Sequence, residues 1–467
     1  MNASRAALLT LAGWLSWAHA ASLVDTSFNI GSGANGIVEH VLEQPDGKIL
    51  ICGNFTSFNG QDKGYVARLN NDGSVDQSFT AGPGYWVRHM ALQTDGKIVI
   101  GGFFKTIGAT KRNLIARLNA DGSMDTTFDP GTGCEVAIAP GIDGNADPFV
   151  MWCEVLADGK ILAVGNFRNY NGSSSVGIVR INSDGSRDTT FNVGGGLDSW
   201  GRVIKPLNNG QIMVGGWFQN YNGRSANRIV RINSDGSPDP TFNAFYGDKT
   251  AVYSIVALSD GKYITSGHSL NEEGLFHREV VRLNHDGSVD SAWPGSTNEK
   301  TESLLLLPNG KVVVTGYFTT VNGQARRSIA RFNADGTLDS GFVANADNYV
   351  WTVAPTGDSG KVLVSGGFGT IDGIARSGVA RLILPEGDTG PGPVTPTSPF
   401  IQNARMNGVR FECTVGSATN FNYILQYKTS ATSAQWYSAN PISGNGGALT
   451  LTDPRPTGTR LYRVEVR

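Results

Sequence analysis

The fold is decided by a stretch that runs from residue 87 to residue 128 and reads VRHMALQTDGKIVIGGFFKTIGATKRNLIARLNADGSMDTTF. Four β-prone runs, residues 87–93, 97–104, 114–119 and 124–128, are separated by polar turns. Asp-Gly occurs in two of these turns, because both residues tolerate the positive φ that tight hairpins need. Helical periodicity is absent. The stretch therefore predicts a four-stranded antiparallel meander.

The same pattern recurs along the chain at intervals of about 50 residues. A turn of the Asp-Gly-Lys kind before an apolar run appears seven times, with its glycine at Gly47, Gly96, Gly159, Gly210, Gly261, Gly310 and Gly360. A second Asp-Gly motif follows the first six, at Gly73, Gly122, Gly185, Gly236, Gly287 and Gly336. One meander cannot bury both of its faces, but seven can close into a ring. We therefore expect an all-β chain with a seven-bladed β-propeller.

The two ends of the repeat region complement each other. The seventh unit stops near Leu384 without its second Asp-Gly motif and fourth strand. Residues 23–28, LVDTSF, copy that missing segment at the other end of the repeats. We expect this N-terminal strand to complete the last blade, because an edge strand left unpaired invites aggregation.

The paired motifs DGKIxxGGxF and IARLNxDGSxDxxF resemble the delta-60 repeat family of bacterial propeller-like proteins, over about residues 22–384. The fifth unit departs from the pattern, with Ser266-Gly267-His268-Ser269 in place of Gly-Gly-x-Phe and Trp293 in place of the final Phe. The resemblance implies a repeat scaffold in exported proteins and no common reaction.

Outside the repeats the sequence predicts three further segments. Residues 1–20 have a positive start, an apolar run and an Ala-His-Ala end, as a cleaved signal peptide does. The repeats then occupy residues 21–384, and residues 385–399 are a linker rich in Pro, Gly and Thr. Residues 400–467 alternate like short strands and resemble a small immunoglobulin- or fibronectin-type sandwich, with a secretion-sorting domain as the alternative.

Composition excludes several classes of function. Lys and Arg number 38 against 40 Asp and Glu among 467 residues, so no basic field exists to attract nucleic acid. No later stretch approaches the ~20 apolar residues of a transmembrane helix. We find no nucleophile elbow, zinc-protease, phosphate-loop or nicotinamide motif. We expect a secreted or cell-envelope protein, a monomer that needs no cofactor.

The chain has four cysteines, which suits an oxidising compartment. Cys134 and Cys153 bracket an insertion of about 13 residues in the third unit, and we predict a disulfide between them. Cys52 lies in a strand-like run and Cys413 in the tail, where each is expected to be a small buried hydrophobe.

Several repeated or paired polar residues have two interpretations. The Asn-x-Asp-Gly-Ser/Thr-x-Asp segments resemble calcium loops, but we favour hairpins whose side chains cap their own backbone and expect no metal site. We expect the seven recurring arginines to pair with the following Asp, since a residue present in every unit serves the unit; they are Arg68, Arg117, Arg180, Arg231, Arg282, Arg331 and Arg381. His40 and His89 line a channel or pack there. Glu272 and Glu273 could do acid–base work, although a solvated loop is favoured.

Aromatic residues gather where the loops differ from unit to unit, on the face opposite the Asp-Gly turns. Ten residues before the turn glycines lie Trp86, Phe149 and Trp200, and Tyr349 occupies the corresponding place in the seventh unit. Aromatic faces at a propeller mouth suit sugar rings or a partner's apolar anchors, while packing between blades is the alternative. The predicted ligand-binding residues are Trp86, Trp200, Tyr349, Trp152, Phe149, Tyr85 and Trp351.

These observations favour an exported, non-catalytic binding module that holds a glycan, or else an extracellular protein, at the propeller mouth. A lyase or hydrolase acting on glycans is one alternative. A purely structural or adhesive surface component is the other.

Overall fold

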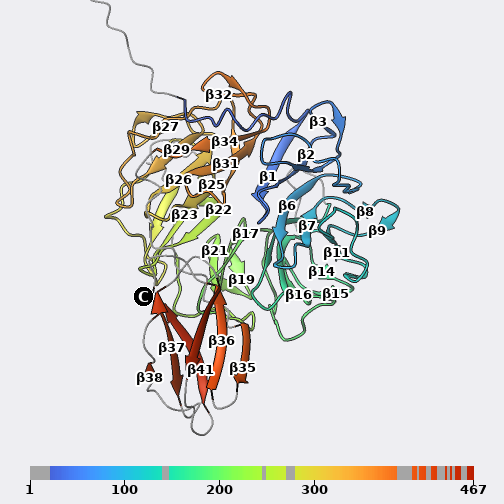
Figure 1. Cartoon of the computed structure of the whole chain (residues 1–467), viewed down its shortest axis with the longest axis vertical. Helices are drawn as coiled ribbons and strands as arrows, with labels where there is room; N and C mark the ends of the chain where they lie inside the picture. Colours follow the sequence, from blue (N-terminus) through green and yellow to red (C-terminus); the bar gives the residue numbers. More distant parts are fainter. Residues whose placement is uncertain are drawn as a thin grey trace, which may run out of the picture.

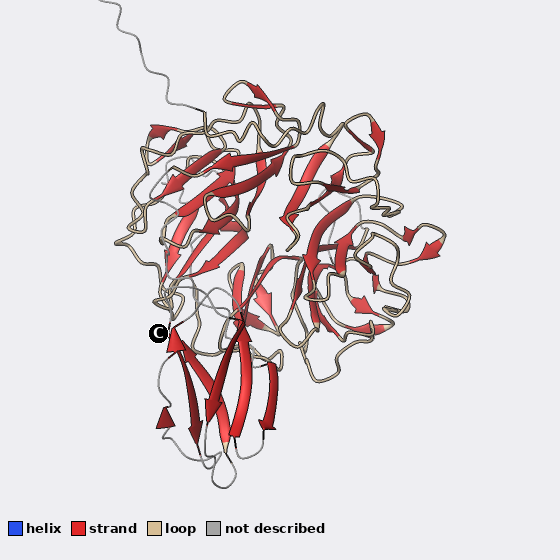
Figure 2. Ribbon diagram, viewed as in Figure 1, coloured by secondary structure: helices blue, strands red, loops and turns tan. Residues whose placement is uncertain are grey.

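The computed structural model describes residues 22–138, 147–244, 249–269 and 279–385 and, in the C-terminal part, residues 402–407, 410–416, 422–428, 437–438, 442–443, 448–453 and 460–466. Throughout these ranges the chain forms strands and loops and contains no helix, so none of it is a helix able to cross a membrane (Figure 2). The predicted signal peptide, nearly all of the linker, and Glu272 and Glu273 lie outside the described residues.

Within the described part of residues 22–385, seven three-stranded antiparallel sheets follow one plan (Figure 1). The innermost strands are β1 (Ile37–Glu43), β6 (Val87–Leu92), β12 (Phe149–Val155), β17 (Gly201–Pro206), β22 (Lys249–Ala257), β25 (Thr301–Leu306) and β30 (Val350–Pro355). The middle strands are β2 (Ile49–Asn54), β7 (Ile98–Gly102), β13 (Ile161–Asn166), β18 (Ile212–Gly216), β23 (Tyr263–Ser269), β26 (Val312–Gly316) and β31 (Lys361–Gly366). The third strands are β5 (Val66–Leu69), β10 (Ile115–Leu118), β16 (Ile178–Ile181), β21 (Ile229–Ile232), β24 (Val280–Leu283), β29 (Ile329–Phe332) and β34 (Val379–Ile383).

Short hairpins connect the middle strand to the third strand in most units. They are β3 (Ser57–Phe58) with β4 (Gln61–Asp62), β8 (Thr106–Ile107) with β9 (Thr110–Lys111), β14 (Asn169–Tyr170) with β15 (Ser173–Ser174), β19 (Asn220–Tyr221) with β20 (Arg224–Ser225), β27 (Thr320–Val321) with β28 (Gln324–Ala325), and β32 (Thr370–Ile371) with β33 (Ile374–Ala375). An additional strand, β11 (Cys134–Glu135), extends the third of these hairpins by pairing with β14.

Consecutive sheets pack face to face around a common axis, and the ring returns to its start. Strand β1 contacts both β30 and β31. One apolar cluster joins the first sheet to the last, with Val38 and Ile51 from the first and Leu363 and Val379 from the last, all fully buried. The repeat therefore buries its two faces against neighbours, as the meander pattern requires.

The predicted fourth strand is much shorter than expected. After the second Asp-Gly turn of each of the first six units, a single residue forms a β-bridge with the third strand, as Met124 does with Leu118. The Asp125 side chain then accepts hydrogen bonds from the amide and hydroxyl of Thr127, at 2.9 and 2.7 Å, which turns the backbone away. The prediction of a full strand over residues 124–128 was therefore wrong.

Residues from the N-terminal end of the described chain occupy this position in the last sheet. Val24 forms a bridge with Leu382, and the amide of Asp25 donates to the Arg381 carbonyl at 2.8 Å. Phe28 is fully buried. Residues 23–28 thus lie beside the third strand of the seventh unit, where the displaced motif predicts them.

The recurring arginine does more than the sequence predicts. In the second unit Arg117 donates from Nε to Asp125 at 2.7 Å, and Lys97 Nζ lies 2.9 Å from the same carboxylate. Arg117 Nη1 also donates to the Ser183 carbonyl in the following unit, at 2.6 Å. The predicted Arg–Asp pair is confirmed, and the guanidinium also joins neighbouring sheets.

The same set repeats around the ring. Its Lys–Asp–Arg members are Lys48–Asp76–Arg68, Lys97–Asp125–Arg117, Lys160–Asp188–Arg180, Lys262–Asp290–Arg282, Lys311–Asp339–Arg331 and Lys361–Asp25–Arg381, while Gln211–Asp239–Arg231 has a glutamine in place of lysine. The seventh set closes the ring, since Arg381 also donates to the Asn71 carbonyl of the first unit at 2.9 Å.

The described strands of the C-terminal part form two antiparallel sheets. One contains β35 (Gln402–Asn407), β36 (Arg410–Gly416) and β40 (Ala448–Asp453). The other contains β37 (Asn422–Lys428), β38 (Tyr437–Ser438), β39 (Ile442–Ser443) and β41 (Leu461–Val466). Phe411 and Tyr462 come from different sheets, and their stacked ring centroids are 3.8 Å apart. Aromatic packing therefore joins the two sheets.

We expect Asp25→Ala to lower the free energy of unfolding by about 3–5 kcal/mol, because it leaves the buried Arg381 guanidinium without its carboxylate at the ring closure. Asp72→Ala is the matched control, since Asp72 is exposed and caps only its own turn. Denaturant unfolding measures both. Equal effects of the two substitutions would contradict a closing role for residues 23–28.

Stability should also fall in acid. Burial alone would raise the pKa of Asp25, but hydrogen bonds from Ser27 and Arg381 outweigh it and lower the pKa to about 2. A depressed pKa contributes stability above the unfolded-state value of about 3.9, and that stability is lost as the pH falls through the folded value. We therefore expect the unfolding free energy to drop between about pH 4 and pH 2. A flat profile there would contradict the sign of this linkage.

Candidate functional site

Every innermost strand contains a β-bulge at the same place. Pairing with the middle strand slips by one residue there, for example between Val38 and His40 and between Val87 and His89. The bulged residues are Glu39, Arg88, Met151, Arg202, Tyr253, Glu302 and Trp351. Because a bulge redirects the side chain of its extra residue, each unit can present a different group at the axis of the ring.

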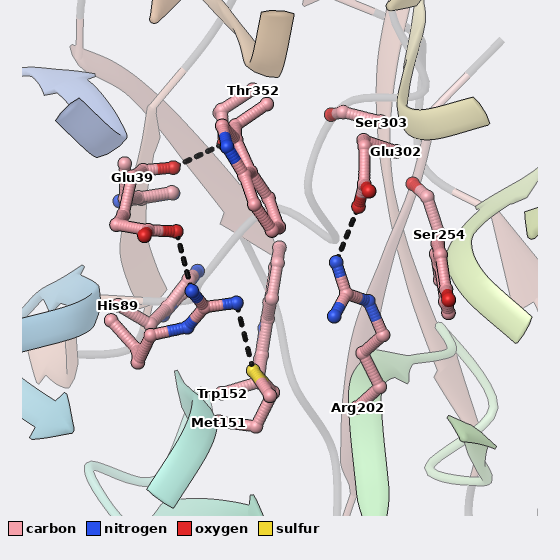
Figure 3. A pocket seen from close by; sticks show the side chains of 13 residues that line it. Glu39, His89, Met151, Trp152, Arg202, Ser254, Glu302, Ser303 and Thr352 are labelled. Atoms are coloured by element: carbon pink, nitrogen blue, oxygen red, sulfur yellow. Dashed lines mark hydrogen bonds and ion pairs between the residues drawn. The ribbon is translucent and has the colours of Figure 1, made fainter. Parts of the chain in front are cut away.

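These seven side chains, which we call the bulge ring, line one cavity (Figure 3). The residues that follow them complete the wall, and they include His40, His89, Trp152, Ser254, Ser303 and Thr352. The cavity volume is ≈ 40 Å³. A water molecule needs about 10–15 Å³ measured in this way. The cavity therefore accepts a few waters or a small functional group but no sugar ring.

Two arginine–glutamate pairs cross the bulge ring. Arg88 Nη1 lies 2.7 Å from Glu39 Oε2, which joins the first and second units. Arg202 pairs with Glu302 and so bridges the fourth and sixth units, passing over Tyr253 of the fifth at 3.9 Å. Burial raises the pKa of Glu39, although the nearby Arg88 and Arg202 charges oppose that shift.

Trp351 contacts both guanidinium groups. The Arg88 Cζ atom is 4.9 Å and the Arg202 Cζ atom 5.6 Å from a ring centroid of this tryptophan. Lys300 adds a third positive charge, with Nζ 3.6 Å from Glu302 Oε1 and 4.8 Å from the Tyr317 ring centroid. Cation–π contacts thus hold three positive groups against aromatic rings of the channel.

The second layer of the cavity is a stack of rings. The His40 and His89 centroids are 4.0 Å apart, and His89 stacks on Trp152 at 3.7 Å. Burial lowers the pKa of His40 to about 3, so this imidazole is neutral near pH 7. Both histidines line the channel, which is one of the two roles predicted for them.

Three stacked aromatic pairs surround the mouth of the channel, at the strand ends opposite the Asp-Gly turns. The distances between the stacked ring centroids are 4.8 Å for Trp86 and Phe103, 5.1 Å for Trp200 and Trp217, and 4.7 Å for Tyr317 and Tyr349. We call the half-buried members of these pairs the mouth rings; they are Trp86, Phe103, Trp217, Tyr317 and Tyr349.

The structure separates the predicted ligand-binding residues into different environments. Trp86 and Tyr349 are mouth rings. Phe149 is fully buried and Trp200 is 8% exposed, and both pack on neighbouring aromatic rings, so their role as ligand contacts stays a prediction. The others are dispersed, with Trp152 and Trp351 lining the cavity and Tyr85, 51% exposed, packing on Tyr65 at 5.8 Å.

Three mouth rings were missed from the sequence. The variable position of the Gly-Gly-x-Phe motif is the residue directly after the middle strand. It is occupied by Phe103, Trp217 and Tyr317. That position pairs in space with the end of the innermost strand, since the amides of Phe103 and Trp217 bond the carbonyls of Trp86 and Trp200. An aromatic residue at the variable position of this motif was the signal available.

The predicted disulfide does not form. Cys134 and Cys153 are both buried free thiols. Cys134 lies on β11 opposite Tyr170, whereas the Cys153 sulfur is directed inward, 3.6 Å from His89 Nδ1. Two strands with different partners hold the sulfur atoms apart, although their residues bracket the same insertion.

The loops that resemble calcium sites use their oxygens internally. The Asp121 carboxylate accepts hydrogen bonds from the amide and hydroxyl of Ser123, at 2.9 and 2.6 Å. This is the self-capped hairpin that the sequence favours. Across the part of the chain that the structure describes, no three His, Cys, Asp or Glu side chains are grouped to hold a metal ion.

Comparison with protein families identifies the repeat. Six segments match the family described as a "Domain of unknown function (DUF5122) beta-propeller", at residues 44–79, 93–128, 156–191, 207–242, 258–292 and 307–342. The chain is built from β-propeller repeats. Each matched segment begins just before one Asp-Gly-Lys type turn and ends at, or one residue before, the aromatic residue that closes the second motif.

Solved structures of low sequence identity are similar to this propeller. The WD40 β-propeller domain of Doa1 is 14% identical over 76% of this chain and 96% of that chain, with a TM-score of 0.49. An exo-β-1,3-galactanase from Phanerochaete chrysosporium is 12% identical over 89% of this chain and 99% of that chain, with a TM-score of 0.29. These similarities do not distinguish binding from catalysis. No curated protein matches the chain.

We expect none of Cys52, Cys134, Cys153 and Cys413 to react with an alkylating reagent in the folded protein, because burial raises the pKa of each thiol. In denaturant without reductant all four should react, as intact-mass measurement would show. If Cys134 and Cys153 react only after reduction, the free-thiol assignment is wrong.

Proposed function

We propose that the protein is an exported binding module whose seven-bladed β-propeller holds a glycan at its mouth. The observation that carries this proposal is the set of mouth rings above a polar cavity. Seven similar sheets, with residues 23–28 beside the last, support seven blades and their closure. The repeat resemblance and the sequence of residues 1–20 support export to the cell surface or medium, and we propose that the exported protein is a monomer.

The geometry favours a ligand that rests on the mouth and inserts only a small group. The cavity of ≈ 40 Å³ excludes a whole sugar ring, so a ring must remain at the level of Trp217 and Tyr349. Aromatic faces and nearby hydrogen-bonding groups are the usual contacts for sugars. A protein partner could use the same rings as apolar anchors, and a structural or adhesive component would need neither the rings nor the charged cavity.

The C-terminal part is proposed to be a small β-sandwich of the immunoglobulin or fibronectin type. Two antiparallel sheets joined by the Phe411–Tyr462 stack support this proposal. We propose that it follows the repeats through a linker over residues 385–399, and that the repeats themselves are of the delta-60 type.

A glycan-cleaving enzyme is the second candidate function. Glu39 and Glu302 line one cavity, and burial raises the pKa of Glu39, as glycosidases require of a general acid. Both carboxylates are engaged by arginine, which favours binding over catalysis. Incubation with each glycan that binds, followed by product analysis, distinguishes the two. Cleavage products that form with the unsubstituted protein and are absent with the Glu39→Gln variant would establish catalysis.

A glycan array probed with the protein tests the proposal. We expect Trp217→Ala and Tyr349→Ala each to weaken binding to the best hit by about 1–3 kcal/mol, the range for truncating an aromatic anchor. Tyr437→Ala is the matched control, because this exposed tyrosine lies in the C-terminal part. Melting curves check that the variants fold. Unchanged affinity in both mouth variants would contradict the proposed site.

A further inference from the structure

We propose that the glycan is a neutral polymer of hexoses, and that the hydroxymethyl group of one hexose enters the cavity and bridges the Glu39 carboxylate and the Trp86 indole. The inference rests on the proposed function, since it specifies the ligand of the same mouth. Its argument comes from polar atoms that are buried around the cavity and its mouth and that make no hydrogen bond with any described residue.

Glu39 supplies the acceptor. This residue is 4% exposed and lines the cavity, where Figure 3 shows its carboxylate. One oxygen, Oε2, accepts a hydrogen bond from Arg88 Nη1 at 2.7 Å. No described residue donates a hydrogen bond to the other oxygen, Oε1. Because a buried acceptor without a donor is costly, a ligand O–H that reaches Oε1 gains a charge-assisted hydrogen bond.

Trp86 supplies a donor close to the same carboxylate. Burial raises the pKa of Glu39, and the Arg88 and Arg202 charges and the Trp86 N–H oppose that shift, which places the indole nitrogen near this carboxyl group. Trp86 Nε1 is itself buried and has no acceptor among the described residues. A donor and an acceptor thus lie near each other without being bonded. A hydroxyl can join them, because it both donates and accepts.

Other unpaired atoms around the mouth have the same mixed character. Glu302 Oε1 is a second buried acceptor, and Trp217 Nε1 and Trp351 Nε1 are further donors, all without a hydrogen-bond partner in the described part of the chain. Lys300 Nζ lies 3.6 Å from Glu302 Oε1, so a small movement of the lysine would pair that oxygen. Glu39 Oε1 is therefore the acceptor that we assign to the ligand.

The balance of charge favours an uncharged group. Arg88 with Glu39 and Arg202 with Glu302 form two ion pairs, each neutral as a pair, and Lys300 adds one positive charge. That excess would repel a ligand ammonium. A ligand carboxylate would place its oxygens against the unpaired oxygen of Glu39. A hydroxyl avoids both repulsions and still donates to the carboxylate.

Size and surroundings indicate the hydroxymethyl group of a hexose. The cavity of ≈ 40 Å³ excludes a sugar ring but takes a group of a few atoms. Bulge-ring side chains contact the mouth rings, since Arg88 Cζ is 5.2 Å from a Trp86 ring centroid and the Trp351 and Tyr349 centroids are 6.0 Å apart. The hydroxymethyl group projects from the sugar ring on a carbon of its own, so it can enter while the ring stays on an aromatic face. A serine of a protein partner offers a similar group, and we treat it as an outcome of the test.

The experiment compares sugars that differ only at carbon 6. Hexamers of β-1,4-glucose, β-1,4-mannose, β-1,4-galactose and β-1,3-glucose are titrated into the mature protein by calorimetry. Each is compared with three twins, in which the 6-hydroxyl is replaced by hydrogen or by an amine, or the hydroxymethyl group is oxidised to a carboxylate. We expect at least one hexamer to bind about tenfold or more tighter than its 6-deoxy twin, and no charged twin to match it. Serine-containing peptides complete the panel.

Two variants then locate the hydroxyl. Trp86→Phe keeps an aromatic ring at the mouth and removes the indole N–H, so we expect the preference for hydroxyl over hydrogen to fall about threefold or more while the 6-deoxy twin binds as before. Glu39→Gln combined with Arg88→Gln removes the carboxylate without leaving a buried unpaired charge, and should lower the preference further. Tyr437→Phe is the matched control, since it removes a polar atom from an exposed ring of the C-terminal part. A preference that survives unchanged in both variants overturns the assignment.

The other outcomes separate the two proposals. Equal binding of every hexamer and its 6-deoxy twin, with water alone satisfying the buried atoms, overturns the hydroxyl and leaves glycan binding intact. Binding confined to pentose glycans, or tighter binding of a charged twin, does the same. Peptide binding with no glycan bound overturns both proposals, as does the absence of binding to any glycan of the array or the panel. Comparing twins needs no variant, so folding does not limit the result.

Discussion

The propeller depends on one interaction that is made again in each unit. An arginine holds the aspartate that turns its own chain and, in most units, reaches a backbone carbonyl in the next, as Arg117 does with Asp125 and Ser183. Ion pairs on an open surface contribute little, but these aspartates and most of these arginines are buried or nearly so. Because repeats are stabilised through nearest neighbours, a contact that fixes both a turn and an interface sets the register of the whole ring.

Much of this architecture could be predicted from the sequence, because its signals are local. Asp-Gly turns, alternating runs and the displaced copy at residues 23–28 each constrain the backbone within a few residues. The fourth strand was overestimated because the hydrogen bonds from Thr127 to Asp125 compete with strand pairing. The Cys134–Cys153 pairing failed because proximity in sequence does not decide which sheet partner a strand takes.

The candidate site was less predictable, and the bulge explains why. A slip of one residue between Val87 and His89 is invisible in the alternation of apolar residues, yet it directs Arg88 to the axis. Reading positions by their distance from the turn glycines found the mouth residues Trp86 and Tyr349. It could not distinguish them from Phe149, which burial removes from the surface. Charged pairs between distant units, such as Arg202 with Glu302, have no sequence signature at all.

The bulge also has an evolutionary consequence. Each blade contributes one side chain to the bulge ring, and the backbone that presents it is the same in every blade. The Asp-Gly turns and the interblade arginines make no contact that depends on the side chain at that position. A codon change there alters one sector of the channel, although a change at Glu39, Arg88, Arg202 or Glu302 also requires a compensating change in its buried partner. Homologues that share the repeat can thus diverge in ligand by rewriting seven positions, and those seven residues form a compact specificity code for comparing or redesigning them.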